Sequence, residues 1–148
     1  MQNLWKIPNR ENSCQSGPCE PDKIIIVFVD ETECTCLRWL KRGFRHCFAA
    51  IQHQDYWIIC DSLKTKIEIS MIRIPMDFNI CKFYSERGHT VLIGRKDTDN
   101  YKKQIYPEFL TCVSVAKRII GIQCYFILTP WQLFKKLTES DSHWRHFS

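Results

Sequence analysis

Residues 44–63 read FRHCFAAIQHQDYWIICDSL, in which two apolar runs flank the polar segment QHQD. Each run has the length and composition of a β-strand, and a few polar residues between such runs are typical of a tight turn, so we predict an antiparallel hairpin with strands at 44–51 and 56–63. Directly opposed residues of a hairpin share one face of the sheet. A loop of two or four residues therefore places Asp61 on the same face as His46, diagonally or directly opposite, whereas a loop of three residues does not.

Further strand patterns lie on both sides of the hairpin. Residues 24–29 read IIIVFV, a continuous apolar run that is typical of a strand covered on both faces, and we expect it near the centre of the sheet. Residues 66–72 alternate between polar and apolar side chains, which predicts a half-exposed strand. Residues 90–93 predict another short strand. The charged segment 94–107 is expected to be a loop.

The clearest helix pattern is at 111–120, which reads TCVSVAKRII. Thr111 has the side chain of an N-cap, so Cys112 is expected as the first helical residue, and Gly121 as the residue that ends the helix. The body of this segment is mainly apolar on one side. The sequence therefore predicts a cysteine in the first turn of a helix that packs on the sheet.

Three other segments predict short helices. Residues 37–42 are expected to form one or two turns that end at Gly43, and residues 77–88 a helix that ends at Gly88. The sequence TPWQ at 129–132 is a strong helix start, with a threonine N-cap, a proline at the first helical position and a glutamine that closes a capping box. This last helix is expected to end near Leu137.

Together these elements predict an α+β fold, with an antiparallel β-sheet packed against the helix that carries the cysteine. The chain of 148 residues is long enough for one domain with a sizeable core. We expect this domain over 23–138. Residues 1–22 are polar and rich in turn residues, which predicts a flexible N-terminal arm, and 139–148 are expected to be a loose C-terminal tail.

The composition disfavours several classes of protein. The formal net charge is +5, and the lysines and arginines are dispersed among acidic residues, so a specific nucleic-acid partner is not expected. No apolar run approaches the roughly 20 residues that span a bilayer. The N-terminus lacks the apolar core of a secretory signal, and nine cysteines is an odd number, so we expect a reducing, cytoplasmic location.

Cys112, His46 and Asp61 have the residue types of a nucleophile, a base and an orienting group. The unpaired N–H groups and the dipole of a helix N-terminus lower the pKa of a thiol, which raises its thiolate fraction. A histidine on a neighbouring strand can hold and return the proton, and an acid on the next strand can orient the imidazole. Backbone N–H groups of the first helical turn, including that of Cys112, can stabilise an oxyanion.

Less specific interpretations of these and other residues stay open. Cys112 can be an inert core thiol and His46 a structural residue of the sheet. Tryptophans can line a substrate groove, although packing in the core or at its rim explains each of them better. Four thiols can bind zinc, but their spacing matches zinc knuckles poorly, and we predict no metal and no cofactor. The tryptophans are Trp39, Trp57 and Trp131, and the thiols are Cys14, Cys19, Cys34 and Cys36.

The order of these motifs resembles the circularly permuted branch of the NlpC/P60 (papain-like) superfamily. In that branch a histidine strand and a polar residue on the next strand precede a cysteine at a helix start. The segments GFRHCF (43–48), WIICD (57–61), FLTCV (109–113) with KRIIGI (117–122), and LTPWQL (128–133) also resemble uncharacterised alphaproteobacterial and phage-associated proteins. The resemblance covers about residues 24–137.

The resemblance implies a cysteine-dependent hydrolase or acyltransferase that acts on an amide or ester through a thioester. Peptides, including peptidoglycan peptides, are the substrates that it suggests. The superfamily often has histidine, asparagine or glutamine where this chain has Asp61. The alternative is a catalytically inactive papain-like interaction protein or phage structural protein.

Overall fold

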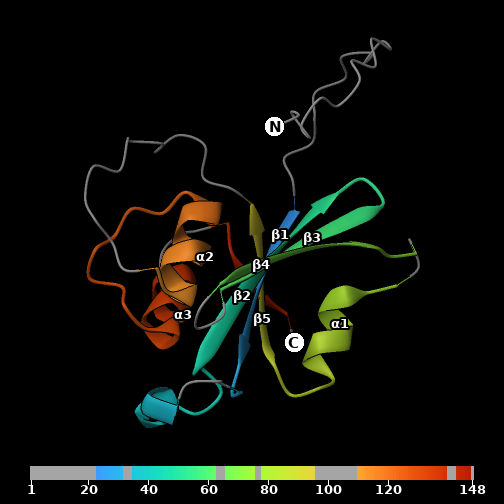
Figure 1. Ribbon diagram of the computed structural model, residues 1–148. Helices are drawn as coiled ribbons and strands as arrows, with labels where there is room; N and C mark the ends of the chain where they lie inside the picture. The colour runs from blue at the N-terminus through green and yellow to red at the C-terminus, as the bar shows by residue number, and fades with distance from the viewer. Residues whose placement is uncertain are drawn as a thin grey trace, which may run out of the picture.

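The computed structural model describes residues 23–31, 35–62, 66–75, 78–95, 110–139 and 143–147. These residues form an antiparallel sheet and three α-helices, in the α+β class that the sequence predicts (Figure 1). The strands are β1 (Lys23–Val29), β2 (His46–His53), β3 (Tyr56–Ser62), β4 (Ile67–Arg73), β5 (Thr90–Arg95) and β6 (Arg145–Phe147). The helices are the 3₁₀ helix η1 (Thr35–Trp39) and the α-helices α1 (Ile80–Ser85), α2 (Cys112–Ile120) and α3 (Pro130–Glu139).

The strand order is β4-β3-β2-β1-β5-β6, and every neighbouring pair is antiparallel. β1 lies in the interior of the sheet, between β2 and β5, and six of its seven residues are buried. This confirms the position predicted from the continuous apolar run. Successive residues of a strand face opposite sides of the sheet, so a strand covered on both faces needs apolar side chains at every position.

Successive residues of β1 supply two separate cores. Ile24, Ile26 and Phe28 face α2 and α3, while Ile25 and Val27 face α1. Figure 1 shows α2 and α3 (orange to red) on one side of the sheet and α1 (yellow-green) on the other. The cysteine helix therefore packs on the sheet as the sequence predicts, in a layer that it shares with α3.

The predicted hairpin is confirmed, with a two-residue connection. His53 pairs with Tyr56, and Ala49 pairs with Cys60. This register places Asp61 beside Phe48 and diagonal to His46 on the same face, which is one of the two arrangements that the loop-length argument allows. The turn requires a positive φ of 52° at Gln54.

Two of the expected helices are shorter than the sequence patterns suggest. α1 begins at Ile80, because Asn79 is extended and its side chain accepts hydrogen bonds from the backbone of Cys81 and Lys82. The expected helix at 37–42 is instead η1 followed by turns with i to i+3 hydrogen bonds, such as Phe44 N to Lys41 O. Tight turns replace an α-helix there because the chain returns to the sheet at Gly43, whose φ is +79°.

Two expectations about the edges of the sheet are wrong. The C-terminal residues are not loose throughout, because Arg145–Phe147 pairs with β5 as strand β6. The preceding Trp144 packs over Gly94, where a side chain would collide with its ring. At the other edge, β4 is exposed along nearly its whole length rather than half-exposed.

Strand β5 extends to Arg95, so the expected loop at 94–107 begins later. The rest of that loop and the expected arm at 1–22 lie outside the described residues. No helix in the described part of the chain is long and apolar enough to cross a membrane.

Candidate active site

Cys112 is the first residue of α2, as the sequence predicts, and a capping box fixes this helix start. The Oγ1 of Thr111 accepts a hydrogen bond from the N–H of Ser114 at 3.2 Å, and the Oγ of Ser114 accepts one from the N–H of Thr111 at 2.8 Å. Gly121 ends the helix with a φ of +85°. The first N–H groups of an α-helix have no partner within it, so those of Cys112 and Val113 can donate to an oxyanion.

His46 is the first residue of β2, and a set of hydrogen bonds holds the chain that leads to it. Asp30, directly after β1, accepts a hydrogen bond from the N–H of Gly43 at 2.7 Å and pairs with the guanidinium of Arg45 at 3.3 Å. The N–H of Arg45 donates to the carbonyl of Val29 at 3.1 Å. The central strand therefore fixes the backbone immediately before the histidine.

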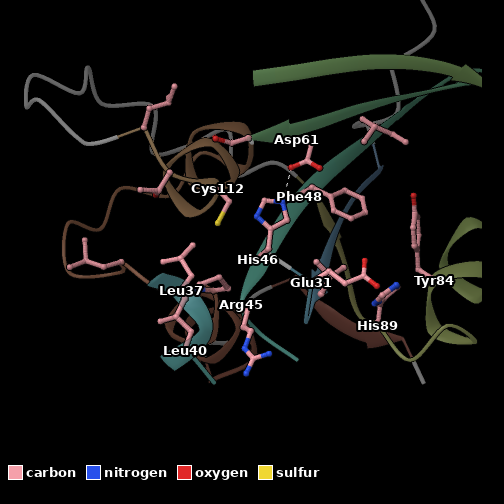
Figure 2. A pocket seen from close by; sticks show the side chains of 17 residues that line it. Glu31, Leu37, Leu40, Arg45, His46, Phe48, Asp61, Tyr84, His89 and Cys112 are labelled. Atoms are coloured by element: carbon pink, nitrogen blue, oxygen red, sulfur yellow. Dashed lines mark hydrogen bonds and ion pairs between the residues drawn. The ribbon is translucent and has the colours of Figure 1, made fainter. Parts of the chain in front are cut away.

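The imidazole of His46 is oriented by Asp61. Its Nε2 lies 2.7 Å from Oδ1 of Asp61, and the side chains of both residues are mostly covered, with 17% and 29% of their surface exposed. Figure 2 shows the His46 ring between Asp61 and Cys112, with its two nitrogens directed to different partners. One nitrogen is thus held by the acid, and the other is available to the thiol.

The electrostatics of the site favour a thiolate and an imidazolium. A hydrogen bond from the Cys47 thiol, together with a hydrogen bond and the charge of His46, outweighs burial and lowers the pKa of Cys112 to about 5. Burial lowers the pKa of His46, but hydrogen bonds to Asp61 and Cys112 and the charges of both outweigh it and raise that pKa to about 9. Between these two values both groups are charged.

Cys47 is the residue of the site that the sequence reasoning missed. It follows His46 directly, and its side chain lies in the core between the sheet and α2, with none of its surface exposed. Alternation along β2 places it on the opposite face from His46, so the strand pattern gives no sign that it belongs to the same site. The N-terminus of α2 lies over that face, so Cys47 meets Cys112.

Cys112, His46 and Asp61 open into one cavity of about 760 Å³. One part of its wall is apolar and contains residues from η1 and the turn after it, from the segments that flank α2, and from the start of α3. Beyond His46, the wall contains polar and aromatic side chains from other segments (Figure 2). The apolar residues are Leu37, Leu40, Leu110, Leu128 and Pro130, and the others include Glu31, Phe48, Tyr84 and His89.

Arg45, the residue before β2, also lines the cavity. Its guanidinium pairs with Asp30 and donates to the carbonyl of Arg38 at 3.1 Å. Gln132 has the capping role that the sequence predicts, because its Oε1 accepts hydrogen bonds from the N–H groups of Leu128 and Thr129.

The structure gives little support to the tryptophan groove or to the zinc site. Trp39 is exposed, Trp57 is a core residue, and Trp131 stacks on Phe134, and none of the three lines the cavity of Cys112. Of the four cysteines considered for zinc, Cys14, Cys19 and Cys34 lie outside the described residues. Within the part that the structure describes, no three metal-binding side chains form a cluster.

No protein-family model, no curated protein sequence and no solved structure matches this chain at a significant level.

Proposed function

We propose that this protein is a cysteine-dependent hydrolase or acyltransferase that acts on an amide or ester bond. The observation that carries the proposal is the contact of one imidazole with both Cys112 and Asp61, at the wall of a single cavity. A structural histidine does not need both an acid and a helix-start thiol as partners. The resemblance to the permuted NlpC/P60 branch supports the same chemistry.

The proposed reaction begins with attack of the Cys112 thiolate on the substrate carbonyl carbon. The negative charge that develops on the carbonyl oxygen is stabilised by N–H groups of the first turn of α2. His46 then gives its proton to the departing amine or alcohol, and a thioester forms on Cys112. His46 next takes a proton from water or from an acceptor amine, which attacks the thioester. The C–S bond breaks, the acyl group leaves as an acid or a new amide, and the Cys112 thiolate is restored.

The cavity favours substrates with an apolar group near the scissile bond. Leucines of η1, of the turn after it and of the segments that flank α2 line the same cavity as the thiol, and Leu110 and Leu128 are exposed. An apolar substrate group that covers these side chains is removed from contact with water. This burial contributes about 25 cal/mol of favourable binding free energy for each Å² of apolar surface. Peptidoglycan peptides stay among the substrates to be tested, on the basis of the resemblance alone.

Alkylation of the native protein by iodoacetamide at pH 6, mapped by mass spectrometry, tests the proposal. At this pH a thiol with a pKa near 5 has a thiolate fraction about 300 times that of an ordinary thiol. Since nucleophilicity falls with pKa, we expect a net advantage of about tenfold for Cys112. Cys47, Cys60 and Cys81 are internal controls, because hydrogen bonding or burial raises the pKa of each.

His46→Ala should reduce this selectivity, because the Cys112 thiolate loses a hydrogen bond and a positive charge, although it keeps its hydrogen bonds from Cys47. His53→Ala, at the exposed far end of the same strand, is the matched control and should leave labelling unchanged. Cys112→Ser and His46→Ala should both abolish turnover in a screen of amides and esters. Uniform labelling, or equal labelling of Cys112 in the His46→Ala protein, would contradict the proposal and favour an inactive interaction protein.

A further inference from the structure

Cys47 is a second thiol in direct contact with the proposed nucleophile. Its Sγ and its backbone N–H both hydrogen-bond the sulfur of Cys112. It is the second residue of β2, a strand paired on both sides, and none of its surface is exposed. Both residues belong to the layer between the sheet and α2. The hydrolytic mechanism does not use the ability of Cys47 to form a bond.

The other described cysteines differ in their surroundings. Cys81 is buried in the core on the α1 side of the sheet, and Cys60 is a half-buried residue of β3 whose pKa burial raises. Cys124 lies in the segment between α2 and α3, where its carbonyl accepts a hydrogen bond from Lys117. Of the cysteines that the structure describes, Cys47 is the one with a hydrogen bond to Cys112.

We propose that Cys47 and Cys112 form a site of reversible oxidation, in which a hydroperoxide converts the two neighbouring thiols to a disulfide. The proposal rests on the reactive Cys112 of the proposed function. A disulfide requires Cβ atoms about 3.5–4.5 Å apart. The hydrogen bond between the two side chains brings them together in the layer between the sheet and α2, where the two sulfurs can be joined.

The chemistry requires one hydroperoxide for each disulfide. The Cys112 thiolate attacks the terminal oxygen, the O–O bond breaks, and the departing alkoxide or hydroxide takes the proton of the His46 imidazolium. Cys112 is then a sulfenic acid. The Cys47 sulfur attacks the sulfenic sulfur, the S–O bond breaks, and the thiol proton and the hydroxide leave as water. The two thiols are oxidised to the disulfide. The hydroperoxide is reduced to one alcohol, or to one water if it is hydrogen peroxide, and the condensation releases one further water.

The two thiols have different roles in this scheme because their environments differ. Cys112 is half-buried at the cavity wall, where a peroxide can reach it. Cys47 is fully buried. Its hydrogen bond to Cys112 is the largest cause that raises its pKa well above the usual range, and burial is the second. Cys47 therefore stays protonated until Cys112 is oxidised. A buried thiol beside a sulfenic acid competes with a second peroxide. It thereby protects the nucleophile from irreversible oxidation to sulfinic acid.

The test treats the full chain with hydrogen peroxide and maps the cysteines by mass spectrometry under non-reducing conditions. We expect a peptide pair joined through Cys47 and Cys112, and loss of iodoacetamide labelling of Cys112 at pH 6. Dithiothreitol should restore this labelling. A disulfide from Cys112 to another cysteine, or oxidation of wild-type Cys112 that dithiothreitol does not reverse, would overturn the proposal.

Two variants sharpen this test. In Cys47→Ser, which keeps a hydrogen-bond donor beside Cys112, peroxide should convert Cys112 to sulfinic acid and dithiothreitol should not restore labelling. Cys81→Ser removes another buried thiol, on the far side of the sheet, and should behave as wild type. If dithiothreitol restored the labelling of Cys112 in peroxide-treated Cys47→Ser as fully as in wild type, the result would count against the proposal. The disulfide map of the wild-type protein decides the question if Cys47→Ser does not fold.

Failure of the proposed function has a different signature from failure of this inference. If Cys112 is not selectively alkylated at pH 6 before any peroxide is added, the proposed function fails. If Cys112 is selectively alkylated but forms no disulfide with Cys47, the proposed function stands and the inference fails.

Discussion

At the scale of single residues, the site depends on one imidazole that contacts both a carboxylate and a thiol. The charge of Asp61 favours the protonated imidazole, and the protonated imidazole favours the thiolate of Cys112. The pKa of each group therefore depends on the charge of its neighbour. Removing the negative charge of Asp61 should lower the pKa of His46, whereas removing the positive charge of His46 should raise the pKa of Cys112.

Asp61→Asn tests this relation, because asparagine keeps an oxygen that accepts from Nε2 but has no charge. In the wild-type protein, an NMR titration of the His46 ring should have its inflection near pH 9. In Asp61→Asn we expect the inflection at a lower pH. Turnover, which needs the thiolate and the imidazolium together, should fall below about pH 5 and above about pH 9 in wild type, and its upper limit should move down in the variant.

Asp55→Asn is the matched control, because this acid is exposed in the turn at the far end of the hairpin. In Asp55→Asn the NMR titration of the His46 ring should have its inflection at the same pH as in the wild-type protein. An unchanged inflection in Asp61→Asn would show that the 2.7 Å contact does not set the pKa of the imidazole.

At the scale of elements, the chemistry depends on where α2 begins. The capping box of Thr111 and Ser114 makes Cys112 the first helical residue, so its sulfur lies at the positive end of the helix dipole. The apolar side of the helix packs on the sheet through Val113, Ala116 and Ile120. Lys117 is also buried, and its Nζ donates to the carbonyls of Cys124 and Ile127 in the segment that leads to the cavity wall. The helix start and the wall of the cavity are therefore held by separate contacts.

Thr111→Ala should lower the free energy of unfolding by about 1 kcal/mol, the usual value of a lost N-cap. It should also raise the pKa of Cys112, because the first turn of α2 loses its fixed geometry. Urea denaturation and the pH dependence of Cys112 alkylation measure the two effects. Thr129→Ala removes the corresponding threonine of α3, whose Oγ1 accepts from the N–H of Gln132 at 3.3 Å.

The Thr129→Ala protein should lose a similar free energy of unfolding without a change in the alkylation profile of Cys112. Equal shifts of the alkylation profile in both variants would mean that general loosening, rather than the start of α2, controls the thiol.

At the scale of the whole molecule, the sheet separates a helix layer of α2 and α3 from a smaller layer of α1. Phe28 is fully buried in the first layer, where its ring contacts those of Phe44 and Phe134. The far edge of the sheet is different, because Ile69 of β4 is 69% exposed. Apolar residues on strands therefore contribute very unequally to stability.

Phe28→Ala should lower the free energy of unfolding by about 3–5 kcal/mol, the usual cost of removing a buried aromatic ring. Ile69→Ala, at an exposed strand position, should change it by no more than about 0.5 kcal/mol. Urea denaturation followed by circular dichroism compares the two variants. Similar losses in both would show that β4 is covered in solution.

The sequence determined the features that depend on residues close together in the chain. The apolar run of β1 has the composition of a central strand. The hairpin pattern allowed His46 and Asp61 to share a face for a loop of two or four residues, and the structure has a loop of two. The threonine and glycine around α2 set its ends and so the position of Cys112. Each of these features follows from local backbone geometry or from a repeat of two residues, which is why a sequence pattern is enough to predict it.

Only the tertiary structure decided which distant side chains meet. The contact of Cys47 with Cys112 depends on where the start of α2 lies over the sheet, and the composition of the cavity wall depends on the packing of η1 and α1. The strand at Arg145–Phe147 forms because β5 offers an unpaired edge, although its own three residues have no strand pattern. These contacts join segments that are far apart in the chain, and their free energy comes from burial and pairing that no local pattern encodes.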